Sequence, residues 1–251
     1  MNSINLDKKV SVVTGGSGGI GRVIAKWLAA AGSLVALGYR NNEAGARAAL
    51  AACGKQAILV KADVSDPDEC QRFVDRVIGE FGQIDILVNN AAIGPTDSFD
   101  MPFEAWKTQW NATLGANLMS AVNMTYLCVP HMKKQGQGKI INIASRSAFR
   151  GETEYMAYAV SKAAMVNFTR CIARTLARDN ILAYAVAPGF IDAGMGLEEI
   201  ARHEDEIRSQ IPSGRIGTSE DVANVVIFLA SDLSNYLTGS TIDVNGGSYL
   251  H

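Results

Sequence analysis

The sequence has 251 residues, of which 48% are hydrophobic and 19% charged, and its formal net charge is −2. This composition is typical of a globular protein with a substantial core, and the balanced charge argues against nucleic acid as a partner. The first residues lack the apolar core of a signal peptide, and no apolar run approaches the ~20 residues of a membrane span. We therefore expect a cytoplasmic protein with no membrane partner.

Four cysteines are scattered along the chain, at positions 53, 70, 128 and 171. Their spacing fits neither a metal site nor a disulfide framework. We expect reduced thiols and no bound metal, and a catalytic cysteine is the weaker alternative.

The N-terminal half alternates between strand-like and helix-like patterns. The valine-rich run from Val10 to Val13 leads directly into a glycine-rich stretch, and apolar residues at helical spacing follow from Ile20 to Ala31. Asp66 and Pro67 are the residue types that cap a helix and begin its first turn. The other elements predicted here are strands at 34–37, 57–60 and 85–88 and helices at 42–52 and 66–81.

The C-terminal half continues the alternation. Its predicted elements are an interrupted helical stretch at 103–132, a strand at 139–144, a helix at 155–176, a strand at 181–186, a helix at 220–230 and a strand at 241–244. This order predicts a single α/β domain over residues 1–251, of the Rossmann type: a doubly wound, parallel seven-stranded sheet with helices on both faces. Residues 190–214 are charged, interrupt the alternation and are interpreted as a substrate lid.

The glycine-rich stretch can be aligned in two registers. Gly16-x-Gly18-x-x-Gly21 matches the usual dinucleotide fingerprint, whereas Gly15-x-x-x-Gly19-x-Gly21 places its first glycine directly after the strand. We prefer the second register because the turn has to begin at Gly15. In both registers bare backbone lets a pyrophosphate approach the amides of a helix N-terminus. A flexible glycine loop without a ligand is the alternative.

Two positions bear on the adenosine end of a dinucleotide. Rossmann proteins that use NAD often carry an acidic residue at the end of the second strand, but here that place holds Gly38-Tyr39-Arg40. Arg40 can contact a 2′-phosphate, or it is a solvated surface arginine. Asp63, which follows the third strand, can reach an adenine amino group or serve as a turn residue.

Tyr158 and Lys162 stand four residues apart on a predicted helix, so their side chains share one face. An ammonium beside a phenol stabilises the phenolate, so the pKa of Tyr158 should fall from about 10 toward working pH. Ser145 ends the strand before this helix. A hydroxyl, a phenol and a lysine together can donate a proton to a carbonyl that accepts hydride.

These motifs occur in the order and spacing of the short-chain dehydrogenase/reductase family, which the chain resembles over essentially its whole length. They are Thr14-Gly15-x-x-x-Gly19-x-Gly21, Asn89-Asn90-Ala91, Asn117, Ser145, Tyr158-x-x-x-Lys162 and Pro188-Gly189. The stretches 210–217, 228–232 and 237–247 are similar to the 3-oxoacyl-[acyl-carrier-protein] reductase branch of that family.

The resemblance implies roles for individual residues. Tyr158 resembles the general acid/base, and Lys162 the residue that lowers its pKa and holds the nicotinamide ribose. Ser145 resembles the hydroxyl that polarises the substrate carbonyl, and Asn117 the asparagine that holds a water linking Lys162 to solvent. The implied cofactor-binding residues are Gly15, Ser17, Gly19, Ile20, Gly21, Tyr39, Arg40, Asp63, Val64, Asn90, Ala91, Tyr158, Lys162, Pro188, Gly189 and Ile191.

Two neighbours of these residues are weaker candidates. Tyr155 is followed four residues later by Ala159, so no ammonium supports it. Ser147 is a weaker rival to Ser145, whose distance from Tyr158 along the sequence is that of the family.

The chain also departs from the family. Ala92 replaces a usual glycine, and Ala193 replaces a frequent threonine near the nicotinamide carboxamide. Carrier-protein reductases use basic residues around the active-site mouth, where Gln135 and Asp179 align; Lys133, Lys134 and Arg178 are close in sequence. Arg146 and Arg150 can grip a substrate carboxylate or phosphate, although surface ion pairs with Glu152 and Glu154 are the preferred interpretation.

Together these features predict an NAD(P)H-dependent oxidoreductase that reduces a carbonyl to an alcohol. The expected substrate is a 3-oxoacyl thioester or a similar ketone, free or bound to acyl carrier protein, and NADP(H) is preferred although NAD(H) is possible. The alternatives are an alcohol, polyol or sugar dehydrogenase and a non-catalytic dinucleotide-binding redox sensor. A homotetramer is expected through the outer faces of helices 103–132 and 155–177, with apolar surface from Met119, Met124, Leu127, Met165 and Phe168.

Overall fold

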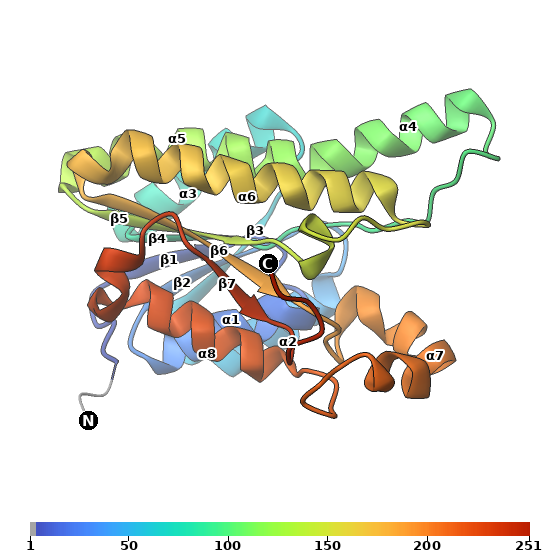
Figure 1. Ribbon diagram of the computed structural model, residues 1–251. Coiled ribbons are helices and arrows are strands. Elements are labelled where there is room, and N and C mark those ends of the chain that lie inside the picture. The colour runs from blue at the N-terminus through green and yellow to red at the C-terminus, as the bar shows by residue number, and fades with distance from the viewer. Residues whose placement is uncertain (1–3) are drawn as a thin grey trace.

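The computed structural model describes residues 4–251. In this range seven parallel strands form one sheet in the order β3-β2-β1-β4-β5-β6-β7, with helices on both faces (Figure 1). The strands are β1 (Val10–Val13), β2 (Leu34–Tyr39), β3 (Ala57–Lys61), β4 (Ile86–Asn89), β5 (Gly138–Ile143), β6 (Ile181–Pro188) and β7 (Thr241–Val244). The predicted doubly wound α/β fold is therefore confirmed.

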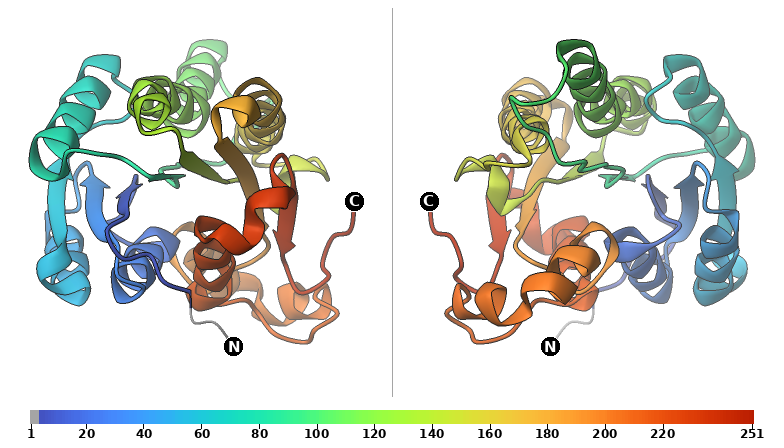
Figure 2. Two further views of the ribbon diagram at one scale, coloured as in Figure 1. Left: turned by 90° about the vertical axis from the view of Figure 1, so that its left-hand side faces the viewer. Right: turned by 90° about the vertical axis from the view of Figure 1, so that its right-hand side faces the viewer.

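Two helical layers bury the sheet (Figure 2). One face is covered by α1 (Gly19–Ala30), α2 (Glu43–Cys53) and α8 (Ser219–Ala230). The other is covered by α3 (Pro67–Phe81), α5 (Ser120–Gln135) and α6 (Met156–Leu176). The helix α4 (Phe103–Leu114) lies in the same layer, against α6. Because both faces are covered, β5 and β6 are buried along their whole length, which explains the nearly continuous apolar sequence of β6.

Side-chain caps define several helix starts. The carboxylate of Asp66 accepts hydrogen bonds from the backbone amides of Asp68 (2.8 Å) and Glu69 (3.2 Å), and Pro67 occupies the first turn, as predicted. The α8 helix begins with a capping box between Thr218 and Asp221.

The long helical stretch is interrupted, as predicted, although the sequence did not locate the break. A π-helical turn, η2 (Gly115–Met119), joins α4 to α5 and contains the buried Asn117. Such turns carry one extra residue and are frequent at functional sites.

Segment 190–214 contains a helix that the sequence analysis did not predict. A short turn, η5 (Gly194–Gly196), leads into α7 (Leu197–Ser209). Ile200 and Ile207 are buried in a small cluster with Ile211. In Figure 1 the segment projects beyond the carboxyl ends of the strands, on the same side of the molecule as the start of α4.

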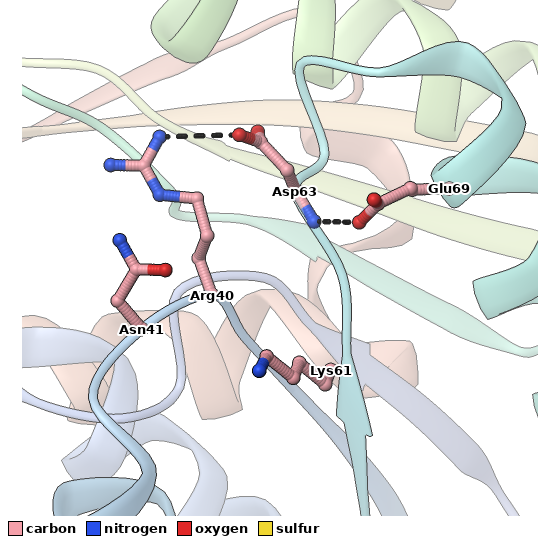
Figure 3. A pocket seen from close by; sticks show the side chains of 5 residues that line it. All are labelled: Arg40, Asn41, Lys61, Asp63 and Glu69. Carbon is pink, nitrogen blue, oxygen red and sulfur yellow. Dashed lines mark hydrogen bonds and ion pairs between the residues drawn. The ribbon is translucent and has the colours of Figure 1, made fainter.

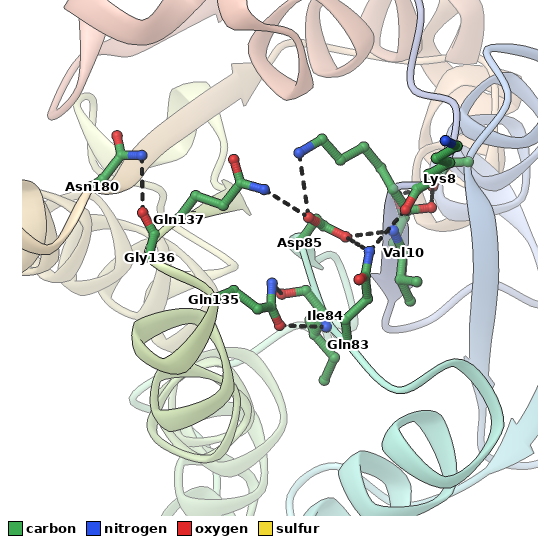
Figure 4. Close-up of polar contacts among 12 residues, drawn as sticks. Lys8, Val10, Gln83, Ile84, Asp85, Gln135, Gly136, Gln137 and Asn180 are labelled. Carbon is green, nitrogen blue, oxygen red and sulfur yellow. Dashed lines mark hydrogen bonds and ion pairs between the residues drawn. The ribbon is translucent and has the colours of Figure 1, made fainter.

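A polar network links the loops at the amino edge of the sheet, where the parallel strands begin (Figure 4). The buried carboxylate of Asp85 accepts from the backbone amide of Val10 (2.9 Å) and from the Gln83 side chain (2.8 Å). The Gln135 amide forms two 3.1 Å hydrogen bonds with the backbone of Ile84, and Asp179 pairs with Lys133 at 2.8 Å. Gln135 and Asp179 precede β5 and β6, so they lie at the edge opposite Ser145; their predicted place at the active-site mouth is wrong for this subunit.

The apolar surface predicted for subunit contacts on helices 103–132 and 155–177 also needs a correction. Met124 and Met165 are buried in the core of the subunit and supply no surface for a partner. Met119, in η2, is exposed as predicted. The other exposed large apolar residues of these helices are Phe103 in α4, Tyr126 in α5 and Val160 in α6. Within residues 4–251 no helix has the length and apolar character needed to cross a membrane.

The start of α6 depends on a residue distant in sequence. Asp97 is buried, and its two carboxylate oxygens accept from the backbone amides of Met156 (2.7 Å) and Ala157 (2.9 Å). The backbone amide of Asp97 donates to the carbonyl of Glu154 at 2.8 Å. A carboxylate satisfies both the unpaired amides and the positive dipole of a helix N-terminus.

We predict that Asp97→Ala lowers the free energy of unfolding by ~2–4 kcal/mol, because two buried amides lose a charged acceptor. Urea denaturation measures this change. Asp100→Ala is the matched control, since Asp100 is an exposed acid in the same loop and its loss should stay within ~0.5 kcal/mol. Equal effects of the two substitutions would contradict the capping role.

Candidate active site

The structure brings Ser145, Tyr158 and Lys162 together at the carboxyl edge of the sheet. Ser145 follows β5, and the other two residues lie in the first turns of α6. The Lys162 ammonium is 5.6 Å from the centroid of the Tyr158 ring and donates to the backbone carbonyl of Ile143 at 2.8 Å. The lysine is almost entirely buried, so this hydrogen bond ties α6 to the end of β5.

The ionisation of this group differs from the sequence prediction. Burial raises the pKa of Tyr158 above its ordinary value, with a smaller opposing effect from the Ser145 side chain. Burial also lowers the pKa of Lys162 to about 7. The predicted fall in the Tyr158 pKa is thus wrong for the protein chain itself, because burial of the phenol dominates. The Lys162 ammonium lies over the face of the ring and bonds to a backbone carbonyl.

Asn117 is placed by the π-helical turn. Its side-chain oxygen accepts from the Ile93 backbone amide (2.7 Å), and its amide nitrogen donates to the Ile93 carbonyl (2.9 Å) and to Ser161 Oγ (3.0 Å). The side chain therefore joins the segment after β4 to α6. Both hydrogens of the Asn117 side-chain amide are therefore engaged by protein groups.

The two weaker candidates point elsewhere. The Tyr155 hydroxyl lies 3.4 Å from a carboxylate oxygen of Glu199 in α7. The Ser147 hydroxyl donates to Glu152 at 2.7 Å, while the Ser147 amide donates to Ser145 Oγ at 3.1 Å. Neither side chain is placed beside Lys162.

Sequence reasoning missed two residues next to Tyr158. A Cβ atom at Gly94 would lie 3.4 Å from the Tyr158 ring and 3.5 Å from the Met195 sulfur. Gly94, in the loop after β4, therefore lies close both to the Tyr158 ring and to Met195 of the turn before α7. A Cβ atom at Gly94 would make only ordinary van der Waals contacts, so this neighbour of Tyr158 is revealed by the fold and not by a requirement for glycine.

The glycine-rich turn has the backbone conformation of the preferred register. Gly15 and Gly19 have φ values of +66° and +51°, and a Cβ at Gly21 would lie 2.4 Å from the Gly15 carbonyl oxygen. Gly18 stands between Ser17 and the start of α1, which includes Ile20. A Cβ atom at Gly18 would meet no other atom within 4 Å. Open space beside a bare helix N-terminus suits a pyrophosphate.

Asn90 and Ala91 fix this turn from the neighbouring strand. The backbone amides of both donate to Thr14 Oγ1 at 3.0 Å. The Asn90 side chain donates to the carbonyls of Thr14 (3.0 Å) and Gly15 (3.1 Å). In the protein chain, Asn90 therefore shapes the binding turn through its side-chain amide.

A hollow of about 390 Å³ lies past the ends of β2 and β3 (Figure 3). It is lined by Arg40, Asn41, Lys61, Asp63 and Glu69. Arg40 reaches Asp63 at 3.4 Å, and Asp63 also accepts from the Ser65 amide (3.0 Å) and hydroxyl (2.7 Å). Desolvation alone would raise the pKa of Asp63, but the bonds from Ser65 and Arg40 outweigh it and the pKa is lowered. Lys61 was missed because only the pairing of Tyr39 with Lys61 across the strands reveals it.

Residues after β6 complete the site. Gly189 donates to the Val244 carbonyl at 3.0 Å, and a Cβ there would lie 2.8 Å from the Cβ of Asn245. Ile191 is buried, and Gly194 approaches the glycine-rich turn so closely that a Cβ at Gly19 would be 3.4 Å from its Cα. The root of segment 190–214 therefore lies against the turn expected to bind pyrophosphate. Pro188 ends β6, and Val64 is buried beside Asp63.

The two arginines after Ser145 behave differently. Arg150 forms the predicted ion pair with Glu152, at 3.7 Å. Arg146 is only 5% exposed, and its guanidinium carbon lies 4.4 Å from the centroid of the Phe190 ring. The interpretation of Arg146 as a surface ion-pairing residue is wrong, because the short turn η3 (Arg146–Ala148) directs it inward.

Comparisons with known proteins agree with this geometry. A family model described as enoyl-(acyl-carrier-protein) reductase matches residues 15–249. The 3-oxoacyl-[acyl-carrier-protein] reductase FabG of Escherichia coli is 38% identical over 250 residues, covering 98% of this chain and all of that protein. Nodulation protein G of Azospirillum brasilense is 36% identical over 247 residues, covering 96% of this chain and 98% of that protein.

A solved structure shows the same likeness in three dimensions. The crystal structure of a putative short-chain alcohol dehydrogenase from Sinorhizobium meliloti superposes with a TM-score of 0.91 at 31% identity, covering 98% of each chain. A nicotinamide dinucleotide is the cofactor of this group of enzymes, and the open glycine-rich turn fits its pyrophosphate. The protein is an oxidoreductase and belongs to the short-chain dehydrogenase/reductase family.

Proposed function

We propose that this enzyme reduces the carbonyl of a 3-oxoacyl thioester or a similar ketone to an alcohol, with NADPH as the preferred reductant. The observation that carries the proposal is the convergence of Ser145, Tyr158 and Lys162 beside the glycine-rich turn. The 38% identity to 3-oxoacyl reductases favours this substrate class. The name of the Sinorhizobium protein supports an alcohol dehydrogenase as the second candidate.

The residues can perform the proton chemistry of reduction. A nicotinamide dinucleotide held at the glycine-rich turn would supply the hydride that the carbonyl carbon accepts. Ser145 donates a hydrogen bond to the carbonyl oxygen, and the Tyr158 phenol gives that oxygen its proton. A raised Tyr158 pKa keeps the phenol protonated at neutral pH, which a general acid requires. Lys162, with a pKa of about 7, is suited to return a proton to the phenolate.

We infer that segment 190–214 acts as a lid within a single catalytic domain. Its root contacts the glycine-rich turn through Gly194, and Met195 lies near Tyr158. The contact between Tyr155 and Glu199 adds a polar link to α7. Gln135 and Asp179 lie at the opposite edge of the sheet and are engaged there, so they do not form a carrier-protein docking site at the active-site mouth of this subunit.

Tyr158→Phe should reduce turnover of acetoacetyl thioester at least a hundredfold while NADPH binding persists, since only the proton donor is lost. Tyr155→Phe, the matched control, should retain a substantial part of the activity. Initial rates of NADPH oxidation with acetoacetyl thioesters, diketones and sugars test both the substrate class and the two variants. If Tyr155→Phe were the inactive one, the placement of the active site would be wrong.

Lys162 should make stability depend on pH. Its pKa is about 7 in the folded chain and ~10.4 when unfolded, so between these values the unfolded state binds more protons and stability rises with pH. Relative to Lys162→Met, the wild type should gain about 2 kcal/mol from pH 7 to pH 9 in chemical denaturation. Lys139, whose pKa is lowered to about 8, is common to both proteins and cancels.

The exposed Lys134 provides the control for this measurement. Lys134→Met should give a profile parallel to that of the wild type, because the side chain is exposed at the end of α5. Parallel profiles for the wild type and Lys162→Met would show that Lys162 stays charged throughout this range.

Arg40 should determine the cofactor preference. It and Lys61 supply positive charge to the hollow, and Tyr39 stands where a carboxylate would repel a 2′-phosphate. A charge-assisted contact of ~1.5–3 kcal/mol gives roughly 10- to 100-fold discrimination, moderated here because Arg40 has to exchange Asp63 for the phosphate.

Arg40→Ala should therefore lower kcat/KM for NADPH roughly tenfold or more, with a much smaller change for NADH. Arg47→Ala is the control, since Arg47 is an exposed arginine of α2 already paired with Glu43 at 2.6 Å. Comparable kcat/KM values for the two cofactors in the wild type would rule out the preference.

We infer a homotetramer built on the outer faces of α4, α5 and α6. Phe103 (68% exposed) and Tyr126 (77%) lie on these helices with Met119 and Val160, and such large apolar groups are stabilised by burial. Light scattering should give the mass of a tetramer at micromolar concentration, and Tyr126→Glu should shift it downward. A monomeric wild type would exclude this assembly.

A further inference from the structure

Arg146 places a positive charge inside the protein without a matching anion. No group among residues 4–251 hydrogen-bonds to its Nη1 atom, and none of the described carboxylates lies within ion-pair distance of it. The nearby acid Glu152 is engaged by the Ser147 hydroxyl at 2.7 Å and by Arg150 at 3.7 Å. A buried, unpaired guanidinium is costly, so the site is suited to receive an anion.

The position of Arg146 relates this charge to the proposed reaction. It is adjacent in sequence to Ser145, whose Oγ caps the turn that begins with Arg146. Its guanidinium is 4.4 Å from the ring centroid of Phe190, the residue after Gly189. Phe190 packs on the isoleucine cluster of α7. The charge therefore lies between the turn of Ser145 and the root of segment 190–214.

Guanidinium chemistry then indicates the type of ligand. An arginine stacked on an aromatic ring keeps its in-plane N–H groups available, and their planar arrangement matches a carboxylate or a phosphate. Arginine also remains protonated when buried, unlike lysine, so it can serve as a permanent anion receptor.

We propose that Arg146 binds an anionic group of the ketone substrate and so selects substrates with a negative charge close to the reacting carbonyl. This rests on the proposed function and narrows its substrate class. A free 3-oxo carboxylate has its charge two bonds from the carbonyl carbon, within the reach expected of the residue next to Ser145. A phosphate on a thioester's carrier arm offers the same chemistry from farther away.

Three substrates separate these sources: acetoacetate, acetoacetyl-coenzyme A and the neutral ethyl acetoacetate. Arg146→Met keeps an apolar stem against Phe190 and removes the charge. It should lower the ratio of kcat/KM for acetoacetate to that for the ester at least tenfold, mainly through KM. A drop confined to the coenzyme A thioester would assign the contact to a phosphate instead.

Arg150→Met is the matched control, since it removes the neighbouring arginine that is already paired with Glu152. In this variant the ratio of kcat/KM for acetoacetate to that for ethyl acetoacetate should stay within about twofold of the wild-type ratio. Arg146→Lys retains the charge without the planar fork and should lose an intermediate factor for the acid. It also tests the inference if the methionine variant fails to fold. Equal losses for all three substrates would reduce Arg146 to a packing residue and overturn the proposal.

Calorimetric titration of acetoacetate into the cofactor-loaded enzyme separates this inference from the proposed function, because it requires no turnover. Binding should weaken at least tenfold in Arg146→Met. If no ketone is reduced but this dependence appears, the reduction fails and the anion site stands. If ketones are reduced and charge has no effect on binding or selectivity, the anion site fails alone.

Discussion

Parallel pairing of β1, β4, β5 and β6 is the constraint on which the site depends. Because these strands run in the same direction, the residues that follow them meet at one edge of the sheet. Thr14, Asn90, Ser145 and Gly189 come from four distant parts of the sequence and reach this edge for the same reason. Hydrogen bonds from Asn90 and Ala91 to Thr14 then join β1 and β4 where the strand order reverses. The amino edge, held by Asp85, has a purely structural network.

Burial gives the catalytic candidates their ionisation properties. A helix carries Lys162 below the surface, where loss of hydration moves the pKa of the amine down and that of the neighbouring phenol up. Desolvation also lowers the pKa of Arg146, but an arginine retains its proton when it is buried. Burial therefore makes Lys162 a group that titrates near neutral pH and leaves Arg146 a permanent cation. The two side chains differ in charge behaviour because a guanidinium has a higher intrinsic pKa than an ammonium.

Local patterns were sufficient to predict the strands and most helices, whereas the full set of catalytic candidates depended on the resemblance to the family. β7 was predicted with its observed bounds, and the cap at Asp66 was correct. Long-range contacts were not predictable: the bonds of Asp97 to the start of α6, the pairing of Tyr39 with Lys61, and the inward turn of Arg146. The α7 helix was missed because its many charged residues obscure the wide spacing of Ile200 and Ile207. The Tyr158 pKa was misjudged because sequence shows the distance between residues but not their solvation.

The π-helical turn at Asn117 has a consequence for insertions and deletions in this chain. Each residue of an α-helix advances the chain by ~100° about the axis, so the extra residue in η2 sets the rotation of α5 relative to α4. Deleting one residue from 115–119 would give a more regular helix, but it would turn the Asn117 amide away from Ile93 and Ser161. A regular α-helix here would therefore not keep the Asn117 side chain directed at Ile93 and Ser161. For this reason the number of residues in 115–119 is constrained even at positions where the residue type is not.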